Sequence, residues 1–307
     1  MPSPRGLLVV DKPAGPTSHD MVDRVRKALT VRRVGHTGTL DPMATGVLLI
    51  CVGKATRLAR FLSAGEKVYL ASVRFGFATS TDDAVGEPLG PVTSAQPELE
   101  AVQAACQSLT GDLLQVPPAY SAKRVRGRRL YELARTGVAA ERPPARVTVH
   151  SLDLRQLRAD RAEIEVRCSA GTYVRALARD LGEALGVGGH LDSLRRTWTG
   201  GFGLEGAVSG DALTPEATRE SLLPMSEALK DLPGLRIDES SVALVRAGRD
   251  LDRSRIVSEP PGEPPPRVRI LDPSGALVAL AVPRGFGFEG HGLAVEPVFH
   301  PDVVLID

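Results

Sequence analysis

The chain contains 307 residues with a formal net charge of +1, and 42% of the residues are hydrophobic, 24% charged and 4% aromatic. This length is typical of about two domains, and the near-neutral charge excludes a protein that is basic over its whole surface. No apolar run approaches the roughly 18 residues of a membrane-spanning helix, so we expect no membrane segment. Three widely spaced cysteines exclude a dense disulfide framework and a Cys-x-x-Cys zinc site, and they favour a cytoplasmic location.

The first part of the chain predicts a strand, a helix and a second strand. Residues 6–11 form a short apolar run, and a proline-rich turn follows it at residues 12–16. Thr17 or Ser18 can cap a helix over residues 20–29, where apolar positions recur with helical spacing. A glycine-rich loop then leads into the apolar residues 47–52, which predict a buried strand.

The middle of the chain mixes helices and strands without strict alternation. We expect helices over residues 56–63, 97–109 and 171–185, and strands over residues 67–75, 146–157 and 162–168. This order favours an α+β fold with a mixed, largely antiparallel sheet and helices packed on it. Residues 215–233 are rich in helix breakers and are interpreted as a linker.

The last part of the chain has a different texture. A short helix near residues 241–247 is followed by short strands at residues 268–271, 276–282 and 293–295, which together are typical of a small β-barrel. Residues 259–266 contain five prolines and predict an extended or disordered loop within it. We therefore expect a domain over residues 1–232 and a second, smaller domain over residues 233–307.

The segment from Gly35 to Leu48 is the most informative stretch of the sequence. It contains three glycines, one histidine and a single carboxylate, Asp41, before an apolar strand. The glycines allow a sharp loop, and Pro42 restricts the backbone of Asp41 to extended conformations. The loop therefore presents one carboxylate from a stiff support. For a lone Asp-Pro pair, the plain alternative is a turn aspartate that bonds its own backbone.

Residues 35–42, Gly-His-Thr-Gly-Thr-Leu-Asp-Pro, resemble the signature of TruB-type pseudouridine synthases, which modify uridine 55 of tRNA. The resemblance implies that Asp41 is the nucleophile, a role that carboxylates can fill by forming covalent adducts. It also implies a pseudouridine synthase domain followed by an RNA-binding PUA domain. The reaction needs no redox step and no external group donor, so we expect no cofactor and no metal.

Two further segments resemble family motifs. Lys67-Val68-Tyr69 matches the second motif, in which the tyrosine stacks on the target base and can act as a base; the alternative is a half-buried strand tyrosine. A phenol suits a uracil pocket because its ring stacks while its hydroxyl reaches polar atoms. Residues 79–86 resemble Thr-Asp-Thr-x-Asp-x-x-Gly, with Asp83 retained and Ser80 in place of the first aspartate.

Residues 168–182 match the third motif of the family. The resemblance implies that Arg175 pairs with Asp41 and with Asp83, and that Tyr173 lines the base pocket. A guanidinium beside a buried carboxylate keeps it ionised and can fix its geometry through two hydrogen bonds. Leu194 matches the apolar residue that packs on the uracil. Without the resemblance, Arg175 would be read as the partner of a structural acid.

His36 and Lys12 complete the residues that the resemblance assigns to the site. His36 would contact the tRNA loop and take the place of an extruded base, and its glycine neighbours leave it room to protrude. Lys12 and Pro13 resemble the family's first motif, in which they support the tyrosine of the second motif.

A basic segment lies within residues 115–146, a region that resembles the insertion with which this family clasps the T arm of tRNA. As a phosphate grip, it would make tRNA affinity depend on salt. The alternative is an amphipathic helix with a solvated charged face. The candidate RNA-binding residues are Lys123, Arg124, Arg126, Arg128 and Arg129.

These observations favour a stand-alone tRNA pseudouridine-55 synthase that contacts the T arm and acceptor stem as a monomer. One alternative is a synthase of the same family that acts in an RNA-guided complex, but such relatives normally lack the basic insertion. A non-catalytic tRNA-binding or tRNA-folding protein is the second alternative, against which Asp41, Tyr69 and Arg175 argue. A glycosidase usually needs a pair of carboxylates, whereas the signature loop supplies one.

Overall fold

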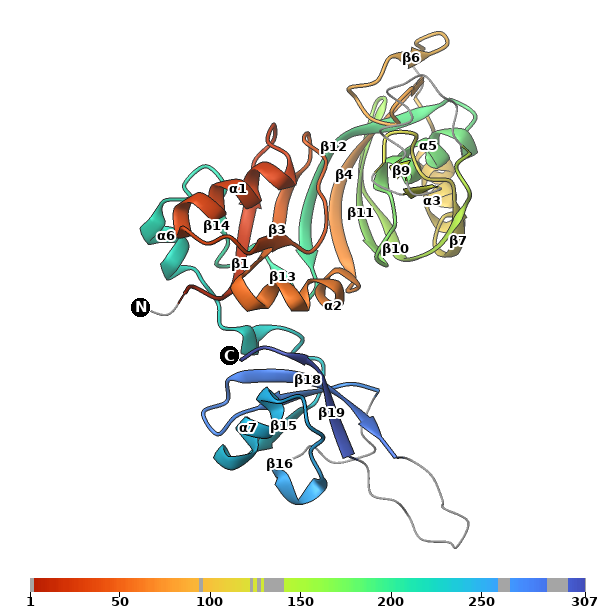
Figure 1. Ribbon diagram of the computed structural model, residues 1–307. Helices are drawn as coiled ribbons and strands as arrows, with labels where there is room; N and C mark the ends of the chain where they lie inside the picture. Colours follow the sequence, from red (N-terminus) through yellow and green to blue (C-terminus); the bar gives the residue numbers. More distant parts are fainter. Residues whose placement is uncertain are drawn as a thin grey trace, which may run out of the picture.

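The computed structural model describes residues 3–93, 96–121, 124–125, 128–129, 141–258, 266–285 and 298–306. Its elements form a large sheet with packed helices and a smaller C-terminal sheet below it (Figure 1). The prediction of an α+β fold is confirmed. Within the described residues, no helix is both long enough and apolar enough to span a membrane.

The large sheet has ten strands in the order β14-β1-β3-β12-β4-β11-β10-β7, with β2 paired to β3 and β13 paired to β12. Its pairings are antiparallel except for β1 with β14 and β3 with β12, which are parallel, so the predicted mixed, largely antiparallel sheet is confirmed. The strands are β1 (Gly6–Lys12), β2 (Val34–His36), β3 (Thr45–Val52), β4 (Lys67–Phe75), β7 (Gly111–Gln115), β10 (Ala145–Arg158), β11 (Arg161–Cys168), β12 (Gly189–Thr199), β13 (Phe202–Gly203) and β14 (Val208–Ser209).

Helices cover both faces of this sheet. Helix α1 begins at the predicted cap, because the Thr17 hydroxyl accepts from the Asp20 N–H and the Asp20 carboxylate accepts from the Thr17 N–H. Its apolar stripe packs on the same face as α3 and α5, whereas η1 and α2 pack on the opposite face. The bounds are α1 (Ser18–Leu29), η1 (Gly53–Leu58), α2 (Ala59–Ser63), α3 (Leu99–Ser108) and α5 (Val174–Ala184).

Strand β12 occupies the centre of the large sheet, between β3 and β4, and it was not predicted. Its sequence contains two adjacent arginines, Arg195 and Arg196, which disguise the alternation of a strand. The strand buries Leu191, Leu194 and Arg196. A charged residue in the middle of a sheet is tolerated only where its donors find partners, so this strand depends on contacts that lie far away in the sequence.

Three segments differ from the predictions in type or extent. The predicted helix from residue 171 begins only at Val174, and the helix predicted over residues 56–63 is a 3-10 turn followed by one turn of α-helix. The predicted linker is not structureless, because it contains α6 (Pro215–Glu220) and η2 (Met225–Glu227). Proline suits the first position of a helix, and Thr214 caps α6 from outside.

The C-terminal sheet has five strands in the order β16-β15-β17-β18-β19. The predicted strands at residues 268–271 and 276–282 are confirmed, whereas residues 293–295 and most of the proline-rich segment lie outside the described residues. An isolated bridge joins Leu251 to Phe299 of β19; closure into a PUA-like barrel stays a prediction. The elements are β15 (Gly234–Ile237), α7 (Glu239–Arg246), η3 (Arg253–Arg255), β16 (Ile256–Ser258), β17 (Val268–Leu271), β18 (Leu277–Arg284) and β19 (Val298–Val304).

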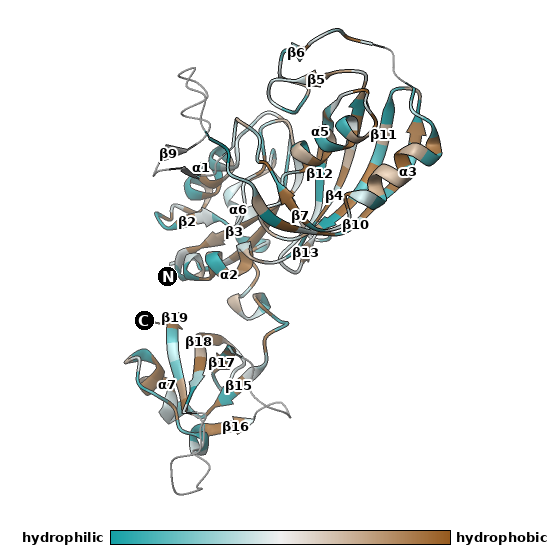
Figure 2. Ribbon diagram, turned by 90° about the vertical axis from the view of Figure 1, so that its right-hand side faces the viewer, coloured by the Kyte–Doolittle hydropathy of each residue, from teal (hydrophilic) through white to brown (hydrophobic). Residues whose placement is uncertain are grey.

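The two sheets share a hydrophobic cluster. Leu277, Leu280 and Leu305 from the C-terminal part pack with buried residues of β1, β3, η1 and α2, and Arg57 donates to the carbonyl oxygen of Val304 at 2.5 Å. Figure 2 shows the smaller sheet beneath the larger one, on the side where α2 lies. Two small hairpins complete the fold: β5 (Ala78–Thr79) with β6 (Pro88–Leu89), and β8 (Arg124–Val125) with β9 (Arg128–Arg129).

Candidate active site

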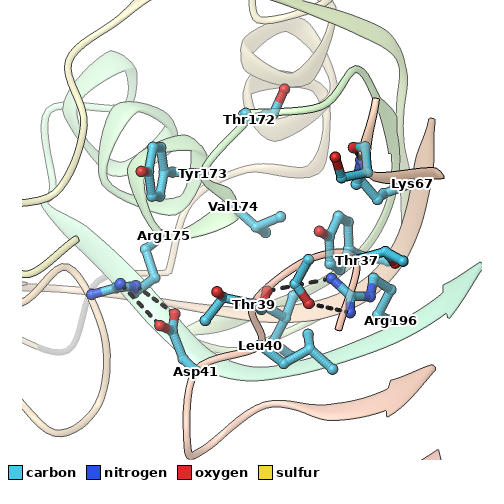
Figure 3. Close-up of a pocket in the computed structure, with 15 residues that line it drawn as sticks. Thr37, Thr39, Leu40, Asp41, Lys67, Thr172, Tyr173, Val174, Arg175 and Arg196 are labelled. Atoms are coloured by element: carbon cyan, nitrogen blue, oxygen red, sulfur yellow. Dashed lines mark hydrogen bonds and ion pairs between the residues drawn. The ribbon is translucent and has the colours of Figure 1, made fainter. Parts of the chain in front are cut away.

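A pocket of about 290 Å³ opens beside strands β4 and β12 of the large sheet (Figure 3). The signature loop supplies residues 37–41, and β4 supplies Lys67 and Tyr69. The turn before α5 and the first two residues of that helix supply residues 171–175, β12 supplies Leu194 and Arg196, and α2 supplies Ser63. The structure thus brings together most of the residues that the motifs single out. A pocket of this size lies at the lower end of the range for small-ligand sites.

An ion-pair network of Asp41, Arg175 and Asp83 lies at one side of the pocket. The Arg175 Nε lies 2.9 Å from Asp41 Oδ2, and its Nη1 lies 3.4 Å from Asp83 Oδ2. The Arg175 side chain is 6% exposed, whereas the Asp41 side chain keeps 33% of its surface open toward the pocket. The guanidinium also donates to the carbonyl oxygens of Thr81 and Tyr120, at 3.1 and 2.9 Å. It therefore fixes two loops as well as one carboxylate.

The electrostatics of this network favour a reactive carboxylate. Burial raises the pKa of the Asp41 carboxyl above its ordinary value, and the Arg175 cation opposes that rise, while the Asp83 charge adds to it. Desolvation makes the carboxylate a stronger nucleophile only if the group stays ionised. Arg175 is thus the residue on which ionisation of Asp41 depends most.

The loop that carries Asp83 is ordered by its own hydrogen bonds. Asp83 Oδ1 accepts from the Thr81 hydroxyl and from the Val85 N–H, and its backbone carbonyl accepts from the Thr79 hydroxyl. Ser80, which replaces the family's first aspartate, accepts from the Glu87 N–H at 3.1 Å. Its position leaves the pairing of Arg175 with Asp83 intact.

Tyr69 is buried in the pocket wall because β4 alternates strictly between its two faces. Burial raises the pKa of the phenol, and the positive charge of Arg196 opposes the rise. Leu194 lies two residues from Arg196 along β12, so both side chains point to the same face as the pocket. Tyr173 and Leu194 line the pocket, in agreement with the placement that the motifs imply.

Arg196 was not predicted to belong to the site, although it is 1% exposed and lines the pocket. Its guanidinium donates to the carbonyl oxygens of Val47, Gly38 and Thr39, at 2.8, 3.1 and 3.4 Å. Figure 3 shows it reaching under the signature loop. The spacing of Leu194 and Arg196 by two residues was the available signal, but it required knowing that β12 is a strand.

Gly46 lies where strand β3 approaches the backbone of Arg196 in β12. Gly46 has φ +100, and a Cβ atom there would lie 2.1 Å from the Arg196 carbonyl oxygen. Only glycine allows β3 to approach β12 so closely, because any side chain would collide with backbone. Gly46 therefore allows the end of the signature loop to pack closely against β12, the strand that supports the loop.

Lys12 contacts the loop that contains Asp41. Its ammonium is fully buried and donates to the carbonyl oxygens of Pro13, Pro16 and Pro42, at 2.8, 2.8 and 3.2 Å. Burial lowers the pKa of this lysine to about 8. Through Pro42, Lys12 supports the loop that contains Asp41. Its support of Tyr69 and its contact with the substrate stay predictions.

His36 is half-buried in β2 instead of protruding from the loop. Its Nδ1 atom is buried and has no hydrogen-bond partner among the described residues, and burial lowers the pKa of the imidazole. The pocket is lined by the next residue, Thr37, and not by His36. The short strand β2 explains the difference, because its pairing with β3 holds His36 within the sheet instead of in the loop. Its role as an RNA contact stays a prediction.

The basic segment is only partly described. Arg124, Arg128 and Arg129 belong to the two-residue strands β8 and β9, but their side chains, and all of Lys123 and Arg126, lie outside the described residues. The prediction of a T-arm clamp is therefore not tested by the structure.

The cysteines are buried and free, as expected of small core residues. Burial raises the pKa of Cys51 to about 12 and that of Cys106 and Cys168 to about 11, which makes these thiols poor nucleophiles at neutral pH. Among the described residues, no group of three or more His, Cys, Asp or Glu side chains is arranged to hold a metal ion.

Comparison with known proteins matches two family models. The model for the TruB family pseudouridylate synthase (N terminal domain) matches residues 26–174, and the model for the tRNA pseudouridylate synthase B C-terminal domain matches residues 175–230. The chain is 41% identical over 305 residues to tRNA pseudouridine synthase B of Solibacter usitatus, covering 98% of this chain and 99% of that protein. It is 54% identical over 215 residues to the protein of that name from Mycolicibacterium paratuberculosis, covering 69% and 73% of the two chains.

Solved structures show the same fold at lower identity. A chain in "Structure of H/ACA RNP bound to a substrate RNA containing 2'-deoxyuridine" aligns with a TM-score of 0.73 at 26% identity, covering 98% of this chain and 85% of that one. A chain in "Crystal Structure of a Cbf5-Nop10-Gar1 Complex" aligns with the same TM-score at 28% identity, covering 98% and 85% of the two chains. Sequence identity along nearly the whole chain, together with the signature aspartate in a preformed pocket, places this protein in the TruB family of pseudouridine synthases.

Proposed function

We propose that this chain isomerises uridine 55 in the T loop of tRNA to pseudouridine, with Asp41 as the nucleophile. The observation that carries the proposal is the ion pair of Asp41 with buried Arg175 at the pocket wall. Its relatives over most of the chain are named tRNA pseudouridine synthase B, which supports tRNA as the substrate and isomerisation as the reaction.

The reaction breaks the bond between ribose C1′ and uracil N1 and forms a bond between C1′ and uracil C5. The carboxylate of Asp41 attacks either the sugar carbon or the base, and the proton on C5 leaves after the new bond has formed. Arg175 keeps the carboxylate ionised, and the planar ring of Tyr69 and the apolar side chain of Leu194 offer surfaces for a uracil that must rotate without escaping. N1 takes up a proton from solvent in place of the one that leaves C5, so the composition of the nucleoside is unchanged overall.

Two rival functions account for fewer observations. The proteins from H/ACA complexes are 26–28% identical to this chain, whereas the proteins named tRNA pseudouridine synthase B reach 41–54%, which favours a stand-alone enzyme. A protein that only binds or folds tRNA has no need for a desolvated carboxylate paired with a buried arginine. We further expect a monomer that works in the cytoplasm and holds the T arm and the acceptor stem.

Tritium release from tRNA labelled at C5 of uracil tests the proposal. The wild-type protein should release tritium, and Asp41→Asn should abolish release while tRNA binding survives, because the amide preserves the shape of the carboxylate but not its charge. A tRNA carrying cytidine at position 55 is the substrate control. Activity of Asp41→Asn within about tenfold of the wild type, or about 1.4 kcal/mol of barrier, would contradict the assignment of the nucleophile.

A further inference from the structure

A second, strongly basic pocket lies at the start of strand β2, outside the site described above. It has a volume of about 500 Å³ and is formed by the first residues of the chain, the turn after α1 and the start of η1. Four of the nine residues that line it are cations, namely Arg5, Arg32, Arg33 and Lys54, and no lining residue is acidic. The chain as a whole carries a net charge of only +1, so this concentration of charge is local.

The backbone around this pocket is held in place by specific contacts. Arg26 donates to the carbonyl oxygens of Arg32 and Val34, both at 3.3 Å, and the Gly53 N–H donates to the Arg33 carbonyl oxygen at 2.8 Å. A Cβ atom on Gly53 would lie 2.8 Å from the Pro4 carbonyl oxygen, so the N-terminal segment packs directly on this glycine. The backbone that lines the pocket is therefore tied to α1 and η1 by these contacts.

Two of the cations are available for a ligand. The side chains of Arg32 and Arg33 are exposed, and within the part of the chain that the structure describes, neither has a hydrogen-bond or ion-pair partner. The nearby C-terminal end of α1 carries about half a negative charge, which the cations outweigh. Arginine is well suited to phosphate because its planar fork can donate two parallel hydrogen bonds.

The chain connects this pocket directly to the active site. Arg33 lines the basic pocket and Thr37, four residues later, lines the active-site pocket. Strand β2 lies between them, so at about 3.3 Å per residue the two positions are roughly 13 Å apart. A stacked nucleic-acid strand advances about 3.4 Å per nucleotide, and the basic pocket therefore lies within a few nucleotides of the uridine that enters the active site.

We propose that Arg5, Arg32, Arg33 and Lys54 form a second binding site for the phosphate backbone of the tRNA substrate, separate from the basic insertion. This inference rests on the proposed function for the identity of the polyanion. The bound phosphates set the position of the RNA strand that flanks the target uridine, and they take no part in the chemistry. Strand β2 with His36 then lies between a phosphate anchor and the reactive carboxylate.

The test compares the salt dependence of tRNA binding for the wild type and for Arg32→Ala/Arg33→Ala. Removing two phosphate-binding side chains should make the slope of log affinity against log salt shallower by about 1.4 to 1.8, since each bound phosphate contributes roughly 0.7 to 0.9. The affinity at any one low salt concentration should also fall, because phosphate contacts contribute to binding without touching the base. Neither side chain has a partner among the described residues, so the melting temperature should be unchanged.

The matched control is Arg158→Ala/Arg219→Ala, which removes the same charge from two exposed arginines that also lack side-chain partners among the described residues. It should leave the slope unaltered. An unchanged slope in Arg32→Ala/Arg33→Ala, or an equal change in the control, overturns the proposed phosphate site. Failure of the wild type to bind tRNA or to release tritium would instead contradict the proposed function, so the two failures are distinguishable.

Discussion

Replacing Arg175 by methionine tests how the pocket keeps its carboxylate ionised. The substitution preserves an unbranched apolar stem but removes the ion pairs with Asp41 and Asp83. It also removes the donors to two loop carbonyls. Asp41 then lies near the carboxylate of Asp83, and among the described residues no other cation lies as close to Asp41 as Arg175 did.

The expected loss of activity follows from the burial of the pair. Removing one partner of a buried ion pair costs about 3 to 5 kcal/mol, and the lower end applies because Asp41 is partly open to the pocket. That figure is a loss of folding stability, so it sets an upper bound on the effect on the reaction: about 3 kcal/mol carried entirely by the barrier, at 1.36 kcal/mol per tenfold, lowers the rate by roughly two orders of magnitude. Arg175 opposes the rise in the pKa of Asp41, so its removal raises that pKa further. The acid limb of the pH–rate profile should therefore move to higher pH, and the loss should be greatest at low pH.

The assay is single-turnover tritium release across a pH series, with Arg179→Met as the matched control. Arg179 lies one turn later on α5 and pairs with Asp82 and Asp180 instead of Asp41. Its removal should change stability without moving the acid limb. A rate for Arg175→Met within tenfold of the wild type, with an unmoved acid limb, would refute the reasoning that Arg175 controls the ionisation of Asp41.

Three further predictions address the support of the signature loop, the basic insertion and the expectation that no metal takes part. Arg196→Lys should lower the free energy of unfolding by about 2 kcal/mol or more, since unpaired buried carbonyls cost about 1 to 3 kcal/mol. The control Arg195→Lys should lower it by less than about 1 kcal/mol, because the pair of Arg195 with Asp11 is partly exposed. Equal losses of the two variants in urea titrations would contradict the support role of Arg196. Replacing the three arginines 126, 128 and 129 by alanine should make the salt slope of tRNA binding shallower by about one unit for each phosphate that the variant no longer binds, and an unchanged slope would show a merely solvated surface. Exhaustive chelation should leave activity intact, and dependence on an added metal beyond tRNA folding would overturn the expectation.

Several elements follow from short-range patterns in the sequence. The Thr17 cap and the apolar spacing of residues 20–29 define α1, because helix formation depends on residues three and four positions apart. The alternation of residues 67–75 places Tyr69 on the buried face of β4 for the same kind of local reason. The glycines around Asp41 likewise indicate a tight loop, and the motifs single out Asp41 and Arg175 before any contact is known.

Other features depend on which strands become neighbours. Asp41 and Arg175 are 134 positions apart in the sequence, and they meet only because β12 lies between β3 and β4. The same arrangement gives Arg196 its three carbonyl partners.

Local patterns define helices and strands because they reflect interactions between residues two to four positions apart. A buried arginine or lysine leaves no such periodic signal, since it is stable only where distant carbonyl oxygens satisfy its donors. Most of the elements, the loop that presents Asp41 and the family could therefore be predicted from residue patterns. The way in which Arg196 holds the signature loop in place could not, because its carbonyl partners come together only through the strand order of the folded chain. The contact of Lys12 with Pro42, 30 positions away, likewise requires the folded chain.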